Sequence, residues 1–171
     1  MNLYLLNKLI QKLPEFAALA SQLAEKSAAG IKLRLPETSF SFMAAAIYAN
    51  FNKPILFVTA HPELARRRFE QVKLWLRSDI NVDFFPEIDL PGSTASADPV
   101  VNSERVKILS LLSRYKAGGN ADKQVPFILT SALSLSGKCI SEDVFLASTI
   151  EIKNGMKIKQ SALLEKIQKL G

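Results

Sequence analysis

Stretches of apolar residues alternate with amphipathic stretches along most of this chain. Three apolar stretches are predicted to be strands: residues 54–60, 80–85 and 125–130. The first is nearly all apolar, as expected of a strand buried on both faces of a parallel sheet. Between the strands, apolar side chains recur with a period close to 3.6, which predicts helices over 62–76 and 101–114. Strands that alternate with helices in this way predict right-handed crossovers and an α/β fold, an open parallel sheet with helices on both faces.

Further elements are predicted ahead of the first of these strands. Residues 2–27 are expected to be helical, in two helices or one kinked helix, because Pro14 suits a first helical position. Residues 31–35 alternate between apolar and polar side chains and predict a short strand. The next helix is expected to begin at Thr38 or Ser39, whose side chains can cap it.

The pattern changes near residue 147. Residues 149–153 alternate, which predicts a strand with one solvated face, and 161–170 predict a basic amphipathic helix. We therefore expect an α/β domain over 1–146 and the start of a second small α/β domain over 147–171. One strand and one helix are too few to be stable alone, so we expect the chain to be a fragment of a longer protein.

Composition adds only broad limits. The single cysteine, Cys139, excludes an intrachain disulfide and fits a reducing cytoplasm. We expect it to be a small residue of the core. Polar residues interrupt every apolar stretch well short of a membrane span. The sequence thus predicts a cytoplasmic protein with no membrane partner.

The distribution of charge is more informative than the net charge of +6, which permits a nucleic-acid partner without requiring one. Three adjacent bases, Arg66, Arg67 and Arg68, lie within the helix predicted over 62–76. They are weak candidates for contacts with DNA, and the alternative is an ordinary solvated helix face. Successive helix residues point about 100° apart, so the three side chains cannot all face one groove.

A nucleotide-binding domain of this class needs G-x-x-x-x-G-K-[ST] after its first strand, because backbone amides, a lysine and a hydroxyl hold the phosphates and magnesium. The corresponding residues here are Pro36, Glu37, Thr38 and Ser39, with neither glycine nor lysine. Glu37 would repel a phosphate. We expect no nucleotide here, whether this is a phosphate loop that lost its function or a turn that never bound anything.

Other catalytic or metal-binding candidates are weak. No acid ends the strand over 125–130, and Glu87 follows a strand only after Pro86 has interrupted its geometry. With one cysteine and one histidine, His61, the sequence lacks the ligands of a zinc site. Ser131, Ser134 and Ser136 lack both a G-x-S-x-G elbow and a second histidine, which argues against a serine triad. We therefore expect no catalytic residue, no metal and no cofactor in this chain.

One series of motifs resembles a known family. A strand ending in Phe85-Pro86, then Asp89-Leu90-Pro91, then a helix carrying Arg105 is similar to the amino-terminal part of the bacterial transcription-repair coupling factor (Mfd). That part is itself similar to the excision-repair protein UvrB. Residues 57–65 resemble a segment with which UvrB and related motors touch DNA, and 150–170 resemble the opening of the family's second domain. The phosphate-loop position, intact in UvrB and degenerate in the coupling factor, favours the latter.

The resemblance implies a fold and a role. The fold would be a degenerate P-loop, helicase-like domain, and the full-length protein an ATP-dependent DNA translocase that displaces stalled RNA polymerase. This module would recruit the UvrA damage sensor for nucleotide excision repair through its second domain. The motor, with its ATP and magnesium, would lie elsewhere in the same polypeptide. Alternatives are a basic DNA-binding module, a UvrB-type excinuclease fragment, or an active nucleotide-dependent enzyme.

We expect Arg105 of this motif series to have a structural role. It lies near the start of a predicted helix, where a positive charge is unfavourable, so a neighbouring group should offset it. A carboxylate such as Glu87, Asp89 or Asp98, or several loop carbonyls, would suit the planar guanidinium. We expect Arg105 to face the loop over 86–102, and the alternative is a solvent-exposed side chain.

Overall fold

The computed structural model describes residues 3–25, 30–88, 98–118, 125–150, 152 and 154–170. The chain divides into two compact units, Met1–Gly137 and Lys138–Gly171. This division falls ahead of residue 147, where the sequence pattern led us to expect the second domain. Each unit is described separately below.

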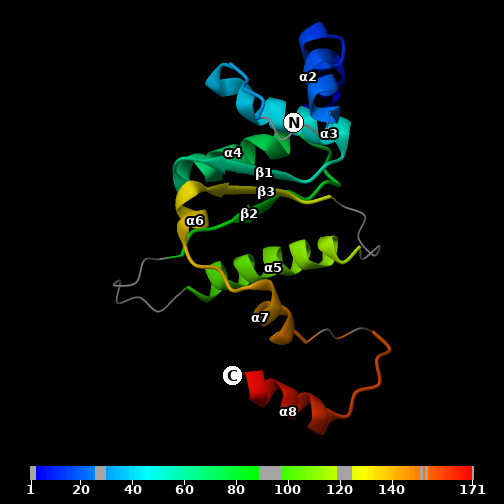
Figure 1. The fold of residues 1–171 in the computed structure, drawn as a ribbon, viewed down its shortest axis with the longest axis vertical. Helices are drawn as coiled ribbons and strands as arrows, with labels where there is room; N and C mark the ends of the chain where they lie inside the picture. Colours follow the sequence, from blue (N-terminus) through cyan, green and yellow to red (C-terminus); the bar gives the residue numbers. More distant parts are fainter. Residues whose placement is uncertain are drawn as a thin grey trace. The chain divides into compact units, whose positions relative to one another are not determined.

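The first unit is built around a three-stranded parallel sheet (Figure 1). Its elements are η1 (Tyr4–Leu6), α1 (Asn7–Ile10), α2 (Pro14–Ala24), η2 (Glu37–Ser39), α3 (Phe40–Phe51), β1 (Ile55–Thr59), α4 (Pro62–Trp75), β2 (Asp83–Phe85), α5 (Pro99–Lys116), β3 (Phe127–Ser131) and α6 (Ala132–Ser136). The strand order is β1-β3-β2, so β3, the last of the three strands along the chain, lies between the other two. The expected α/β class with a parallel sheet is confirmed.

The central strand β3 divides the core into two parts. All five of its residues are buried, and alternate side chains face opposite sides of the sheet. Phe127 and Leu129 pack with Val72 of α4 and with residues of α3, whereas Ile128 contacts Ile108 of α5. Helices therefore cover both faces of the sheet around β3, as Figure 1 shows.

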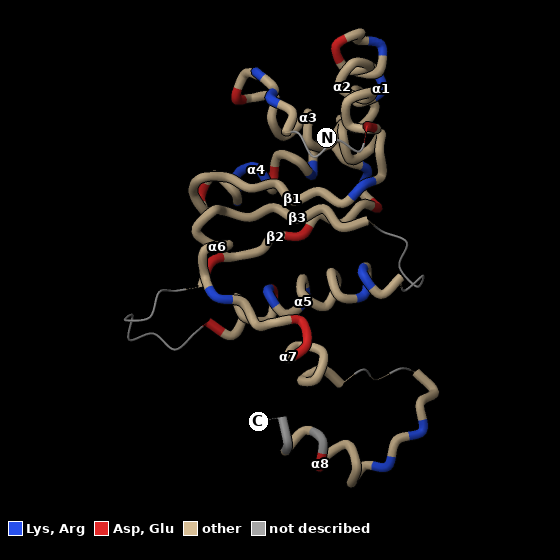
Figure 2. The backbone as a smooth tube through the Cα atoms, viewed as in Figure 1, with Lys and Arg blue, Asp and Glu red and all other residues tan. Residues whose placement is uncertain are grey.

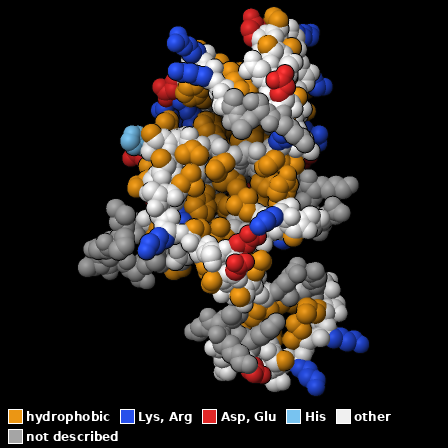
Figure 3. Space-filling model, in the orientation of Figure 1, with side chains coloured by type: hydrophobic (Ala, Val, Ile, Leu, Met, Phe, Trp, Pro, Cys, Tyr) orange, Lys and Arg blue, Asp and Glu red, His pale blue; other side chains and the backbone are white. Residues whose placement is uncertain are grey.

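The strand β1 is not buried on both faces, and that expectation is wrong. Leu56 and Val58 are 56% and 43% exposed, while the alternate residues Ile55 and Phe57 pack against the core. The reason is position in the sheet: β1 is an edge strand, and α5 packs beside β2 and β3. Apolar side chains are accordingly visible on the surface of this unit (Figure 3).

Two other strand predictions need correction. The second apolar stretch, residues 80–85, forms a strand only over Asp83–Phe85, because the residues before it make a turn in which the Ile80 amide donates to the Arg77 carbonyl. Residues 31–35 form no strand. Their alternating pattern has no neighbouring strand to pair with, and Ile31 and Leu33 are exposed.

The predicted helices are present with shifted ends. Pro14 begins α2, which separates it from α1, as expected. The helix ends at Ala24, earlier than predicted. Thr38 and Ser39 belong to the short η2 turn, and α3 starts after them at Phe40 without a side-chain cap.

The N-terminal segment closes the end of α4. The Leu3 amide donates to the Leu74 carbonyl at 2.8 Å, and the Asn7 side-chain amide donates to the Trp75 carbonyl at 2.6 Å. The last carbonyls of a helix lack partners within it, so groups from elsewhere must satisfy them. Asn7 is buried for this reason, although it lies on a helix whose leucines are largely exposed.

The second unit contains α7 (Glu142–Ala147) and α8 (Gln160–Leu170). Thr149, Ile150 and Ile152, the described residues of the predicted strand over 149–153, are not in a strand. The helix predicted over 161–170 is present as α8, one residue longer at its start. In the described part of the whole chain, no helix has the length and apolar character needed to cross a membrane.

Candidate functional site: an arginine and glutamate cluster beside α4

The three adjacent arginines of α4 point in three directions. Arg66 lies over the Phe84 ring, with its guanidinium carbon 5.0 Å from the ring centre. Arg67 is exposed and pairs with Glu37, and Arg68 is buried, with its side chain only 3% exposed. Arg66 and Arg67 both line the groove described below, whereas the spacing of about 100° turns Arg68 into the protein, so the three share neither one groove nor one solvated face.

Arg68 is held by a network that joins α4 to the start of α3. Its Nη1 donates to Gln71 Oε1 at 2.9 Å, and the Ser41 hydroxyl donates to the same oxygen at 3.0 Å. The guanidinium carbon lies 5.7 Å from the centre of the Phe40 ring. A charge buried to this degree needs an opposite charge, because an unpaired buried ion is strongly unfavourable.

Glu37 supplies that charge from the position where a phosphate loop would lie. One of its carboxylate oxygens, Oε1, accepts from Arg68 Nη2 at 2.8 Å and from Arg67 Nη2 at 3.1 Å. The structure thus brings together two sets of residues that the sequence analysis treated separately. Thr38 and Ser39 belong to the same η2 turn, which Pro36 precedes.

The family motif also converges in space where the structure describes it. Arg105 is buried in the second turn of α5, and its Nη1 donates to the Pro86 carbonyl at 2.6 Å. Its guanidinium carbon lies 3.9 Å from the centre of the Phe85 ring. The partner of Arg105 is therefore a loop carbonyl, where the sequence led us to expect either a carboxylate or loop carbonyls. Asp89, Leu90 and Pro91 lie outside the described residues.

The start of α5 differs from the predicted boundary. The helix begins at Pro99 rather than at 101, and Asp98 caps it by accepting from the Val100 amide at 2.9 Å. Asp98 is therefore engaged at the helix start, and Arg105 takes a backbone carbonyl as its partner. Lys107, on the same helix, pairs with Asp83 of β2 at 3.0 Å.

A groove of about 850 Å³ runs beside α4, β2 and the start of α5. Arg66, Arg67 and Gln71 form part of its wall, and the ring of Phe84 lies among the lining residues. The acids that line it are Glu63, Glu70, Glu87 and Asp98. Figure 2 shows acidic and basic positions interspersed along α4. The groove therefore carries both signs of charge and is poorly suited to a long polyanion.

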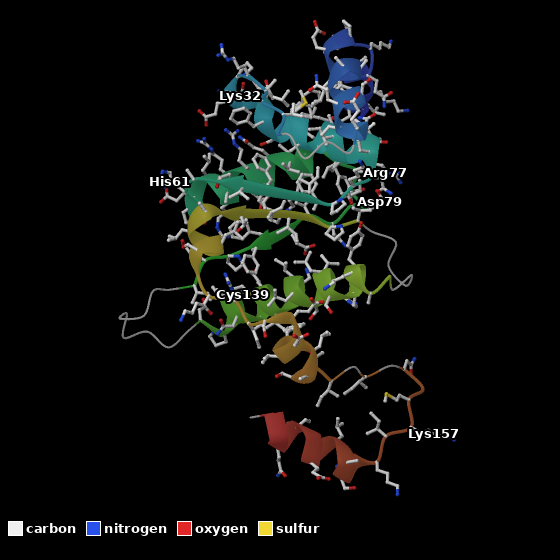
Figure 4. The ribbon with its side chains drawn as sticks, in the orientation of Figure 1. Lys32, His61, Arg77, Asp79, Cys139 and Lys157 are labelled. Carbon is white, nitrogen blue, oxygen red and sulfur yellow. The ribbon has the colours of Figure 1, made fainter. Side chains whose placement is uncertain are left out.

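The remaining candidate residues for chemistry lie in local hydrogen bonds or on the surface. His61 is exposed where β1 meets α4 (Figure 4), and its carbonyl accepts from the Thr59 hydroxyl. Ser131 and Ser134 hydrogen-bond to each other, and the Ser131 oxygen also accepts from the Ser134 amide. Cys139 is exposed, so the expectation of a core cysteine is wrong.

Metal-binding groups of three or more histidine, cysteine or carboxylate residues are not found within the described ranges. Comparisons with models of protein families, with curated proteins and with solved structures find no match for this chain. The functional argument therefore depends on the residues and their contacts.

Proposed function

We propose that this chain is the UvrB-like module of a transcription-repair coupling factor, a non-enzymatic part that recruits the UvrA damage sensor. The proposal rests on the motif series in the sequence, and one contact supports it most. Arg105 lies 19 residues after Pro86 in the sequence, yet its guanidinium stacks on the Phe85 ring and donates to the Pro86 carbonyl. A motif whose members support each other in the fold is less readily explained as a chance match.

The arrangement at Glu37 supports the degenerate P-loop reading. A carboxylate lies against two arginines in the η2 turn just ahead of α3, where the sequence would place a phosphate-binding loop with its backbone amides and lysine. The strand that would lead into such a loop is not formed by residues 31–35. Such a position would oppose a bound triphosphate. The module would then serve as a scaffold, and ATP hydrolysis would belong to a motor elsewhere in the same polypeptide.

The UvrA-docking surface would lie in the second unit. Its helix α8 exposes Leu164 and Ile167, each 52% exposed, within the sequence QSALLEKIQKL. Exposed apolar side chains on one helix are suited to a partner that covers them. The full-length protein would also contact RNA polymerase and DNA. The basic DNA-binding alternative is less well supported, because Arg67 and Arg68 are already paired with Glu37.

Binding to purified UvrA, measured by biolayer interferometry, tests the proposal. We expect the chain to bind UvrA, and we expect Leu164→Asp together with Ile167→Asp to weaken that binding. Leu5→Asp is the matched control, because Leu5 is an exposed leucine of the other unit. No binding of the parent chain to UvrA, with the fold intact by circular dichroism, would refute the recruiting role.

A further inference from the structure

We propose that Arg67 and Arg68 form an oxyanion site that Glu37 keeps closed from within the chain. A single phosphate group from outside would compete with the Glu37 carboxylate for this site. The inference does not depend on the family assignment, since it uses only the contacts around α4.

The site is preorganised without its anion. Arg68 is fixed by Gln71 and stacked against Phe40, and Gln71 is held in turn by Ser41. Three groups other than Glu37 thus define where the Arg68 guanidinium lies. Removing Glu37 would leave a buried, oriented cation whose Nη2 had lost its acceptor. That is the situation in which a protein site gains most from an added anion.

The internal occupant reaches the site from the surface, and an anion from outside would have to replace it as the partner of the buried Arg68. The side chain of Glu37 is 65% exposed and that of Arg67 is 61% exposed. Ion pairs at exposed positions contribute little, because water and salt screen them and ordering two long side chains costs entropy. Both arginines bind the same carboxylate oxygen. A phosphate could give a separate oxygen to each guanidinium, an arrangement that arginine favours.

The surroundings limit the ligand to a small one. The groove that Arg67 and Gln71 line is also lined by Glu63, Glu70, Glu87 and Asp98. These carboxylates would repel the further charges of a polyphosphate or a nucleic-acid backbone. We therefore assign inorganic phosphate, or one terminal phosphate group, as the matching ligand.

The test is a titration with sodium phosphate, followed by isothermal calorimetry, with sodium chloride at matched ionic strength as the blank. Glu37→Gln keeps the shape of the side chain and removes its charge. We expect this variant to bind phosphate at least about fivefold more tightly than the parent chain, because it loses the exposed pair with Arg67 and also the competing charge beside the buried Arg68. Adding Arg67→Ala, a change at an exposed residue, should abolish the gain.

Glu70→Gln is the matched control, because it removes one acid of α4 that pairs with Lys73 at 3.2 Å. We expect its phosphate affinity to stay within a factor of about two of the parent value, since long-range charge effects at the surface are screened. Equal gains in Glu70→Gln and Glu37→Gln would overturn the proposal, because they would indicate a general charge effect. Absence of saturable binding in Glu37→Gln would also overturn it.

Discussion

Replacing Arg105 by alanine should destabilise the first unit well beyond the effect of an ordinary surface change. The side chain is 5% exposed and donates to the carbonyl of Pro86, which is itself buried. Truncation would leave that acceptor without its donor, at a cost of about 1–3 kcal/mol. Loss of the stacking on Phe85 would add about 1 kcal/mol.

The sum predicts that Arg105→Ala lowers the free energy of unfolding by about 2–4 kcal/mol. For a chain of this size that corresponds to a fall in Tm of about 5–15 °C. Urea unfolding followed by circular dichroism measures the first quantity and calorimetry the second. Arg105→Lys keeps the charge without the planar fork, so we expect it to recover only part of the loss.

Arg114→Ala is the control on the same helix. Arg114 is exposed and its Nε lies 3.4 Å from its own helix carbonyl at Ser110, so the change should stay within about 0.5 kcal/mol. Hydrogen exchange in peptides covering 84–88 and 98–102 should rise in Arg105→Ala and stay unchanged in Arg114→Ala. Equal stability of the two variants, with equal exchange, would show that Arg105 does not organise this part of the chain.

Three further predictions concern binding and the start of α5. Calorimetric titration with magnesium-ATP should give no binding heat, because Glu37 takes the place of the glycines and lysine of a phosphate loop. Micromolar binding of ATP would contradict the interpretation of this segment as a degenerate phosphate loop. Fluorescence anisotropy should show weak DNA binding that falls steeply with salt, since only a few phosphate contacts are available. Tight, sequence-selective binding at physiological salt would instead favour the DNA-binding alternative. Asp98→Ala should cost about 1 kcal/mol in chemical unfolding by removing the cap on the Val100 amide, whereas the exposed Glu104→Ala should be nearly neutral.

The sequence predicted most helices because their apolar periodicity is a local property. Pro14 and Pro62 each sit at the start of a helix, and both could be placed from the pattern. Whether both faces of a strand are buried could not be predicted in the same way. An apolar run predicts a strand, but whether Leu56 and Val58 are covered depends on strand order, which the local pattern does not contain.

The site was missed for a related reason. Grouping Arg66, Arg67 and Arg68 as one run of charge hid their different directions. A signal was available: Ala65, Arg68 and Val72 are three and four residues apart and therefore share the buried stripe of α4. The pairing with Glu37 could not be found, because it joins residues 31 positions apart through tertiary packing.

The position of β3 has a consequence for synthesis on the ribosome. In the described sheet β1 and β2 pair only with β3, which is the last of the three strands to be translated. The Thr59 hydroxyl of β1, for example, donates to the carbonyl of Thr130, which lies 71 residues later in the chain. A nascent chain that has not yet reached β3 holds both outer strands without a partner. The sheet therefore forms late and cooperatively, and apolar segments stay open to chaperones or aggregation until then.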